Sequence, residues 1–290
     1  MTGTPKLVND MAAIDARMDE HRNAGGLASL GIEHHHGVAV HRTGDGPALV
    51  LLHGGRGSWN HWIRNIPELA KSHSLYVLDL PGFGVSAPVA RDLPYDQYLL
   101  ILAAAIRQMT DGNRFQLAGF SFGGQCAALL TAHHIGAQVD RLSLLAPAGW
   151  GNDSANGRES RRSLRGVTSE AEKREVFRHN LLANQIADPE KVTEHTVDLL
   201  AYNIAHTVFH SPAAGSLPLL LGGLKGVRQP LQVMLGERDI IQQPSVEWRA
   251  ERIMESAPHA TIEILPGAGH WAQYEVPDEY NRRLLRFLRG

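Results

Sequence analysis

Short apolar runs alternate with amphipathic segments along most of the chain. The run at 48–52 is apolar throughout, and those at 75–80 and 142–146 are apolar except for Asp79 and Ser143, which is typical of parallel strands buried on both faces. Between them, 95–109 and 122–134 read as helices. This alternation predicts the α/β class, a mostly parallel twisted sheet with helices on both faces. Further strands are predicted at 38–42, 115–118, 231–235 and 261–265 and further helices at 59–71 and from 245 and 278, with Gly44-Asp45-Gly46 forming a hairpin turn between 38–42 and 48–52.

An amphipathic helix is predicted ahead of the first strand. Met11, Ile14 and Met18 recur at the spacing of one helix face within 8–22. We interpret 1–30 as an N-terminal helical extension. It is expected to cover either the edge of the sheet or a partner subunit in a homodimer.

The alternation also stops in the second half of the chain. Residues 149–169 are rich in Gly, Asn, Ser and Arg and predict a long loop. Helical patterns follow without a strand, which predicts an all-helical cap inserted into an α/β core. The helical patterns lie at 170–184 and 189–209, and an apolar stretch interrupted by glycines follows at 213–227. The cap is assigned to 148–228, and the core to 31–147 and 229–290.

Composition narrows the class of protein. The chain has 290 residues, 43% of them hydrophobic and 20% charged, so a sizeable core is possible and disorder over most of the length is excluded. A net charge of −2 is unlike that of a nucleic-acid binder. The single Cys126 excludes an internal disulfide and a cysteine metal cage. Without a signal-peptide pattern or a long apolar run, we expect a soluble cytoplasmic protein without membrane association.

The strongest chemical signal lies between a predicted strand and a predicted helix. Gly119-Phe120-Ser121-Phe122-Gly123 has the form G-x-S-x-G, in which a tight turn strains the serine and exposes its hydroxyl. Small flanking residues are needed because neighbouring backbone comes close. The alternative is a Gly-rich turn with a capping serine. The position after a strand favours Ser121 as a nucleophile.

A second Gly-rich loop follows the strand at 48–52. After His53, the segment Gly54-Gly55-Arg56-Gly57 can present backbone N–H groups to an anion. We assign the N–H groups of Gly55 and Phe122 to an oxyanion hole. A phosphate loop is a weak alternative because no G-K-[ST] follows, and His53 is interpreted as a residue that fixes the loop.

Two later strand ends supply an acid and a base. A serine hydroxyl needs an adjacent base, and His270, after 261–265, titrates near neutral pH. Asp239, after 231–235, would orient that imidazole. The order Ser121, Asp239, His270 is the one that this kind of fold uses. The alternatives are a helix cap for Asp239, Glu237 as the acid, and a surface position for His270.

These residues together strongly resemble the α/β-hydrolase superfamily. The resemblance covers about 35 to 290 and implies the α/β-hydrolase fold, the catalytic triad, the oxyanion pair and a cap over the pocket. It is carried by HGG at 53–55, LDLPGFGVS at 78–86, GFSFGG at 119–124, LGERD at 235–239 and GAGHW at 267–271.

Within the superfamily, the chain is most similar to the meta-cleavage-product hydrolases, which break C–C bonds in anionic dienoates. The similarity lies in SWNHWIRNIP at 58–67 and GHWAQYEVPDEYN at 269–281. Those enzymes usually have Asn where this chain has Phe120 and His61, and an arginine in a cap helix where this chain has Tyr202 and Asn203.

Further residues are candidates for binding a substrate or a metal. An apolar pocket under the cap is expected to bind a small-molecule substrate, although each aromatic residue can equally be core packing. His206 and His210 have metal-ligand spacing, but no third ligand is evident, so no metal and no cofactor is expected. The candidate substrate-binding residues are Gly54, Arg56, Trp59, His61, Phe120, Tyr202 and Trp271.

The sequence therefore predicts a cofactor-independent serine hydrolase acting on a small to medium apolar ester or related acyl compound. C–C bond hydrolysis of a vinylogous diketone by a similar triad is the first alternative. A non-catalytic ligand-binding protein on the same fold is the second.

Overall fold

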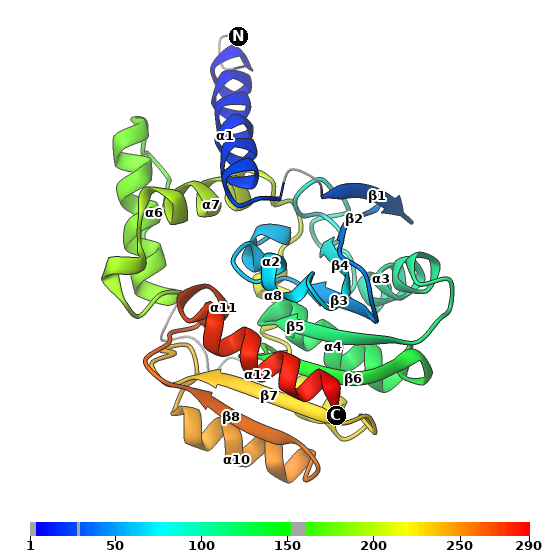
Figure 1. Cartoon of the computed structure of the whole chain (residues 1–290). Coiled ribbons are helices and arrows are strands. Elements are labelled where there is room, and N and C mark those ends of the chain that lie inside the picture. Colours follow the sequence, from blue (N-terminus) through cyan, green and yellow to red (C-terminus); the bar gives the residue numbers. More distant parts are fainter. Residues whose placement is uncertain (1–3, 28–29, 152–160) are drawn as a thin grey trace.

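The computed structural model describes residues 4–27, 30–151 and 161–290, with side chains from residue 11 onward in the first helix. Its centre is one eight-stranded sheet in the order β1-β2-β4-β3-β5-β6-β7-β8 (Figure 1). From β4 to β8 every neighbouring pair is parallel, which confirms the predicted α/β-hydrolase fold. The strands are β1 (Gly31–His35), β2 (Val38–Thr43), β3 (Ala48–Leu52), β4 (Ser74–Asp79), β5 (Phe115–Phe120), β6 (Val139–Leu145), β7 (Leu231–Gly236) and β8 (Thr261–Leu265).

The first strands pair differently from the prediction. β2 forms antiparallel pairs with β1 and with β4, so the predicted hairpin of β2 with β3 is wrong. Gly44 and Gly46 have positive φ, and the backbone of Ala70 to His73 lies against them. A Cβ at either glycine would collide with that backbone, so these residues carry the chain past β4 instead of reversing it.

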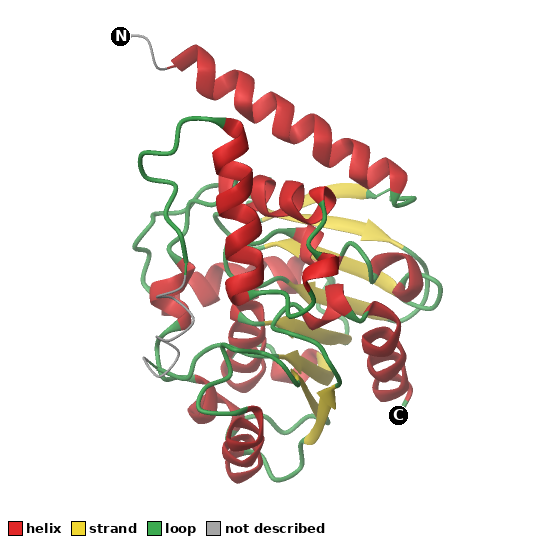
Figure 2. Ribbon diagram, turned by 90° about the vertical axis from the view of Figure 1, so that its left-hand side faces the viewer, coloured by secondary structure: helices red, strands yellow, loops and turns green. Residues whose placement is uncertain are grey.

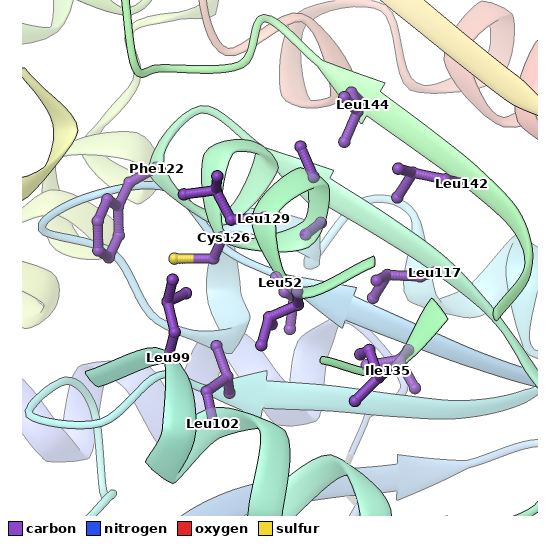
Figure 3. Close-up of a cluster of buried hydrophobic side chains, with 14 of the residues drawn as sticks. Leu52, Leu99, Leu102, Leu117, Phe122, Cys126, Leu129, Ile135, Leu142 and Leu144 are labelled. Carbon is purple, nitrogen blue, oxygen red and sulfur yellow. The ribbon is translucent and has the colours of Figure 1, made fainter. Parts of the chain in front are cut away.

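Successive residues of the central strands face two separate cores. Val50 and Leu52 belong to a cluster shared with α3, α4 and α10, whereas Leu49 and Leu51 belong to a cluster on the other face. Figure 3 shows the first cluster, in which Cys126 lies among leucines. The helices beside the sheet are α2 (Ile66–Leu69), α3 (Tyr95–Met109), α4 (Phe122–His133), α10 (Val246–Ser256), α11 (Ala272–Glu275) and α12 (Pro277–Arg289), with short 3-10 helices η1 (Trp59–Trp62) and η2 (Gly136–Gln138).

The single helix predicted at 59–71 is two short ones, η1 and α2. Pro67 explains the break. A proline in a helix interior removes one backbone hydrogen bond and clashes with the preceding turn, but it is tolerated in the first turn of a new helix. Asn65 stands between the two helices and donates through Nδ2 to Gln273 O at 3.0 Å.

The chain between β6 and β7 is helical in its described part, and we call residues 161–228 the cap. Its helices run across one end of the sheet (Figure 2). Short irregular segments join them and lead back to β7. They are α6 (Glu170–Asn184), η4 (Pro189–Lys191), α7 (Glu194–Ala205), α8 (Ser211–Gly215) and α9 (Leu220–Leu224).

The N-terminal helix α1 (Thr4–Ala24) packs along α7 of the cap, and not along the sheet edge (Figure 1). Asp198 of α7 accepts a hydrogen bond from His21 Nε2 at 2.9 Å and forms an ion pair with Arg17 at 3.2 Å. His206 Nε2 contacts Asp15 Oδ1 at 2.7 Å. These contacts tie the extension to the cap. Among the described residues, no helix is both long and apolar enough to cross a membrane.

Candidate active site

Ser121 stands at the sharp turn from β5 into α4. Its φ of 51° lies in the left-handed region, which is strained for a residue with a side chain. A Cβ on Gly119 would lie 2.5 Å from Gly123 O, and one on Gly123 would lie 2.5 Å from Leu52 O. The turn therefore needs glycine on both sides of the serine. Ser121 itself is partly exposed and borders a cavity.

A chain of hydrogen bonds joins Ser121, His270 and Asp239. His270 Nε2 lies 2.9 Å from Ser121 Oγ, and its Nδ1 lies 2.7 Å from Asp239 Oδ2. Asp239 Oδ1 accepts from the backbone N of Ile241 at 2.9 Å. Because an ionised carboxylate only accepts, the Nδ1 proton of His270 points at Asp239 and Nε2 is left to accept the serine proton. Glu237, the competing acid, instead accepts from Gly267 N at 2.7 Å.

Gly55 and Phe122 lie beside each other at the mouth of this site. A Cβ on Gly55 would lie 3.6 Å from Phe122 Cβ and 2.8 Å from Ser211 Oγ, so a side chain there would displace the cap. Both residues line the same cavity as Ser121. The loop and the start of α4 are thus close enough for two backbone N–H groups to face one oxygen atom.

His53 holds the Gly-rich loop in place. Its Nε2 accepts from Leu80 N at 2.9 Å, which leaves the proton on Nδ1, and Nδ1 donates to Gly54 O at 2.7 Å. Full burial lowers the pKa of His53 to about 4. The imidazole is therefore neutral at working pH and acts as a fixed brace for the loop.

His61 braces the same loop from the other side. Its Nδ1 accepts from Gly54 N at 3.2 Å, and its carbonyl oxygen accepts from Trp271 Nε1 at 3.0 Å. Burial, with His53 and His270 nearby, holds the pKa of His61 well below its ordinary value. Its ring lies 4.8 Å from Trp271 and 5.4 Å from Phe120 between centroids.

Asp79 organises the loops below the site. Burial alone would raise its pKa, but His41 with further hydrogen bonds lowers it overall. Asp79 Oδ1 accepts from Trp59 N at 2.7 Å, while Oδ2 accepts from Val85 N at 3.0 Å and contacts His41 Nε2 at 3.1 Å. The carboxylate thus joins strand β2 to the start of η1 and to the loop after β4, and it does not reach Ser121.

Two adjoining cavities lie under the cap, and we call the one bordered by Ser121 the inner cavity and the other the outer cavity. The inner cavity has a volume of about 130 Å³ and is bordered by Ser121 and His270. The outer cavity, of about 540 Å³, is bordered by Leu164, Phe177 and other cap residues. The two cavities share Gly55, Arg56, Arg161, Gln185 and Pro212.

Of the predicted substrate-binding residues, Arg56 borders both cavities, and His61 and Trp271 border the outer one. The other four line neither. Phe120 packs behind the site, with its ring centroid 5.1 Å from that of His270. Tyr202 packs on His206 at 4.3 Å, facing α1, because the amphipathic α7 turns it away from the cavity. Trp59 packs on His41 at 5.3 Å, and Gly54 lies beneath Phe120.

The cavity also contains polar residues that the sequence pattern did not indicate. Ser211, Asn184 and Gln242 are buried, and each borders the inner cavity. Arg249 of α10 borders it as well, with its guanidinium 4.0 Å from the centroid of the Trp150 ring. None belongs to a short motif, so only the packing of the cap on the sheet reveals them.

The described residues contain no group of three or more His, Cys, Asp or Glu that could hold a metal ion. His206, one of the two spaced histidines, is instead bound to Asp15. Cys126 is buried beside Tyr95 Oη at 3.4 Å, and burial raises the pKa of its thiol to about 12. That thiol is inert as a nucleophile.

Comparison with known proteins identifies the family of the chain. The model of the alpha/beta hydrolase family matches residues 49–283, so the chain belongs to that family. The chain is 27% identical over 270 residues to the 2-hydroxy-6-oxononadienedioate/2-hydroxy-6-oxononatrienedioate hydrolase of Comamonas testosteroni, which covers 87% of this chain and 91% of that protein. The predicted resemblance to the C–C hydrolases is thereby confirmed, and the chain is an enzyme of the hydrolase class.

The chain is also similar to part of a longer protein and to a solved esterase structure. The chain is 31% identical over 251 residues to the dihydrolipoyllysine-residue acetyltransferase component of the acetoin cleaving system of Pseudomonas putida. The match covers 84% of this chain but only 64% of that protein, which is less than two thirds of its length. The crystal structure of naproxen esterase from Bacillus subtilis has the same fold, with a TM-score of 0.73, 20% identity, and coverage of 95% of this chain and 98% of that one.

Proposed function

We propose that this enzyme is a cofactor-independent serine hydrolase that cleaves a carboxylic ester or related acyl compound. The observation that carries the proposal is the hydrogen-bonded chain from Ser121 Oγ through His270 to Asp239, at 2.9 and 2.7 Å. A serine hydroxyl becomes a useful nucleophile only with a base in such contact. The strained backbone of Ser121 and its place on a cavity add support.

In the first half of the reaction, Ser121 Oγ attacks the carbonyl carbon while His270 Nε2 takes the serine proton. The carbonyl oxygen becomes an oxyanion, which the N–H groups of Gly55 and Phe122 stabilise. Each such donor contributes roughly 3–4 kcal/mol to the transition state in well-studied hydrolases. His270 then gives its proton to the leaving group, and the acyl group stays on Ser121.

In the second half, a water molecule gives a proton to His270 and attacks the acyl carbon. The bond from the acyl carbon to Ser121 Oγ breaks, His270 returns the proton to the serine, and a carboxylic acid leaves. Asp239 keeps the Nδ1 proton in place and stabilises the imidazolium that forms twice in the cycle.

Hydrolysis of a C–C bond is the second candidate, and a specific observation favours it. The relative in Comamonas testosteroni that matches 87% of this chain is named as a hydrolase of 2-hydroxy-6-oxononadienedioate and 2-hydroxy-6-oxononatrienedioate. The same serine, base and acid would serve, with His270 first assisting tautomerisation of the substrate. The non-catalytic alternative is set aside because the chain is an enzyme.

The test is hydrolysis of p-nitrophenyl esters from acetate to octanoate by the wild type, Ser121→Ala and Cys126→Ala. We expect turnover to vanish in Ser121→Ala and to persist in Cys126→Ala, because the thiol is buried and protonated. The acyl chain length that gives the highest turnover indicates the length of acyl group that the cavity accommodates. Equal background rates in the wild type and Ser121→Ala would remove simple esters, and turnover of a dienoate would then favour the second candidate.

A further inference from the structure

Asn184 ends α6 at a fixed position beside the candidate active site. The carbonyl oxygen of the next residue, Gln185, accepts from Trp271 N at 2.8 Å, and Trp271 directly follows His270. Glu275 reinforces this junction, since Oε2 accepts from Gly269 N at 2.6 Å and Oε1 from Ala187 N at 2.9 Å. The end of α6 therefore cannot move independently of the loop that carries His270.

The side chain of Asn184 is buried but has no hydrogen-bond partner. It is only 2% exposed, and neither Oδ1 nor Nδ2 is bonded to any described residue. The observation does not depend on which amide atom is oxygen, because both are unpartnered. Gln242, 3% exposed, likewise has an unpartnered Oε1. Both residues border the inner cavity together with Ser121 and His270.

Unpartnered buried amides are unfavourable, because each loses its hydrogen bonds to water and gains none in the fold. At a cavity the missing bonds come from water or from a ligand, and a ligand with matching polar groups takes the place of that water. Asn184 Nδ2 offers a donor and Gln242 Oε1 an acceptor, so the N–H and C=O of one trans amide have separate partners. An alkyl chain satisfies neither, and a carboxylate only accepts. A neutral amide both donates and accepts, so it is the matching group.

We propose that Asn184, together with Gln242, binds a neutral amide group of the substrate next to the carbonyl that Ser121 attacks. The substrate class is then an acyl compound with an amide in its chain, in place of the apolar ester expected from sequence. The assignment of the attacked carbonyl rests on the proposed function. The binding of the amide rests only on the cavity and the unpartnered atoms.

The experiment compares two esters with equal chain length, p-nitrophenyl N-acetyl-β-alaninate and p-nitrophenyl hexanoate. Their kcat/KM values, corrected for hydroxide-catalysed hydrolysis, are measured for the wild type, Asn184→Leu and Asn113→Leu. Asn113 is exposed on the turn before β5, so it is a matched control. We expect the wild type and Asn113→Leu to prefer the amide ester by about tenfold or more, the effect of a site built to hydrogen-bond its substrate. In Asn184→Leu the ratio falls to about one.

Thermal unfolding separates this role from a structural one. Leucine removes two unpartnered polar atoms at similar volume, so Asn184→Leu is expected to melt at the same temperature as the wild type or higher. If Asn184→Leu does not fold, Gln242→Leu serves instead, with a smaller fall in the ratio expected. Equal kcat/KM for the two esters in the wild type, or a preference that survives in the folded variants, would overturn the proposal.

Binding to Ser121→Ala distinguishes this proposal from the proposed function. Methyl N-acetyl-β-alaninate and methyl hexanoate are titrated into Ser121→Ala and into Ser121→Ala/Asn184→Leu by calorimetry. Tighter binding of the amide ester that is lost with Asn184 supports the site even when the wild type hydrolyses neither ester. If the wild type hydrolyses both esters but binding shows no such preference, the reaction stands and the amide site is rejected.

Discussion

His53 illustrates how burial makes a histidine a structural residue. Both ring nitrogens are used, one to accept from Leu80 N and one to donate to Gly54 O, so a second proton would break a hydrogen bond in the dry interior. The same side chain in an exposed loop would titrate near pH 6.5. The loop that contains Gly55 is therefore held by a residue that stays neutral, as the proposed proton transfers by His270 require of its surroundings.

This role predicts a pH dependence of stability. Burial lowers the pKa of His53 to about 4, so the unfolded chain takes up this proton below about pH 6.5 and the folded chain only near pH 4. The contribution of neutral His53 to the free energy of unfolding is complete above pH 6.5. It is lost as the pH falls toward 4, by up to about 1.4 kcal/mol per pH unit. When the free energy of unfolding is measured with denaturant at several pH values in this range, its slope against pH should be shallower for His53→Gln than for the wild type. His34→Gln, at an exposed position, is the control, and an unchanged slope in His53→Gln would contradict the account.

The glycines of the turn at Ser121 predict a contrast in stability. Alanine at Gly123 places a Cβ against backbone oxygens of Leu52 and His53, so Gly123→Ala should lower the free energy of unfolding by roughly 2–3 kcal/mol or prevent folding. Nothing lies within 4 Å of a Cβ at Gly222 in α9, so Gly222→Ala should stabilise by about 0.5–1 kcal/mol. Chemical denaturation of both variants measures the difference. Equal effects would mean that the turn is not tightly packed.

At the residue scale, the sequence predicts those site residues that lie in a short motif or directly after a predicted strand. Ser121 lies within a five-residue motif, and Asp239 and His270 follow predicted strands, so the sheet itself brings them together. Asn184 has no such signal, because its environment comes from packing between the cap and the loop of His270. Tyr202 fails as a cavity residue for the same reason, since the rotation of α7 decides which face meets the cavity.

At the scale of elements, hydrophobic periodicity predicts where a helix or strand lies in the sequence better than it predicts which other element packs or pairs with it. The helix at 95–109 and the strand at 261–265 have the predicted bounds. β2 pairs with β1 and β4 and not with β3. The partner of a strand depends on the path of the chain between strands, which the strand's own hydrophobic pattern does not contain. The position of α1 could not be predicted either, since its partner, α7, is far along the chain.

The contact between α1 and α7 depends on Asp198. This carboxylate pairs with Arg17 at 3.2 Å, His21 at 2.9 Å and Arg174 at 2.7 Å. Asp198→Asn removes the carboxylate that these three side chains share, while Glu170 stays near Arg17 and Glu194 stays paired with Arg174. Because the side chains are partly exposed, we expect a loss of about 1–2 kcal/mol in the free energy of unfolding. Thermal unfolding tests this, with Glu68→Gln in an exposed ion pair as the control. The same midpoint for Asp198→Asn and the wild type would show that the charge of Asp198 does not hold α1 on the cap.

At the scale of the whole molecule, the candidate site exists only where separate parts of the chain meet. Ser121 comes from the end of β5, Asp239 and His270 follow β7 and β8, and the cap supplies Ser211 and Asn184 to the cavity. The parallel strands bring their carboxyl ends to one edge of the sheet, where such folds bind ligands. The central claim is that this edge contains an activated serine.

Labelling with a fluorophosphonate tests that claim most directly. An activated serine forms a bond to phosphorus and fluoride leaves, so peptide mass spectrometry locates the reacting oxygen. We predict one adduct, on Ser121, formed by the wild type and Cys126→Ala, and strongly reduced in His270→Ala because the base is gone. No adduct on Ser121, an adduct on another residue only, or equal labelling of heat-unfolded protein would contradict the account.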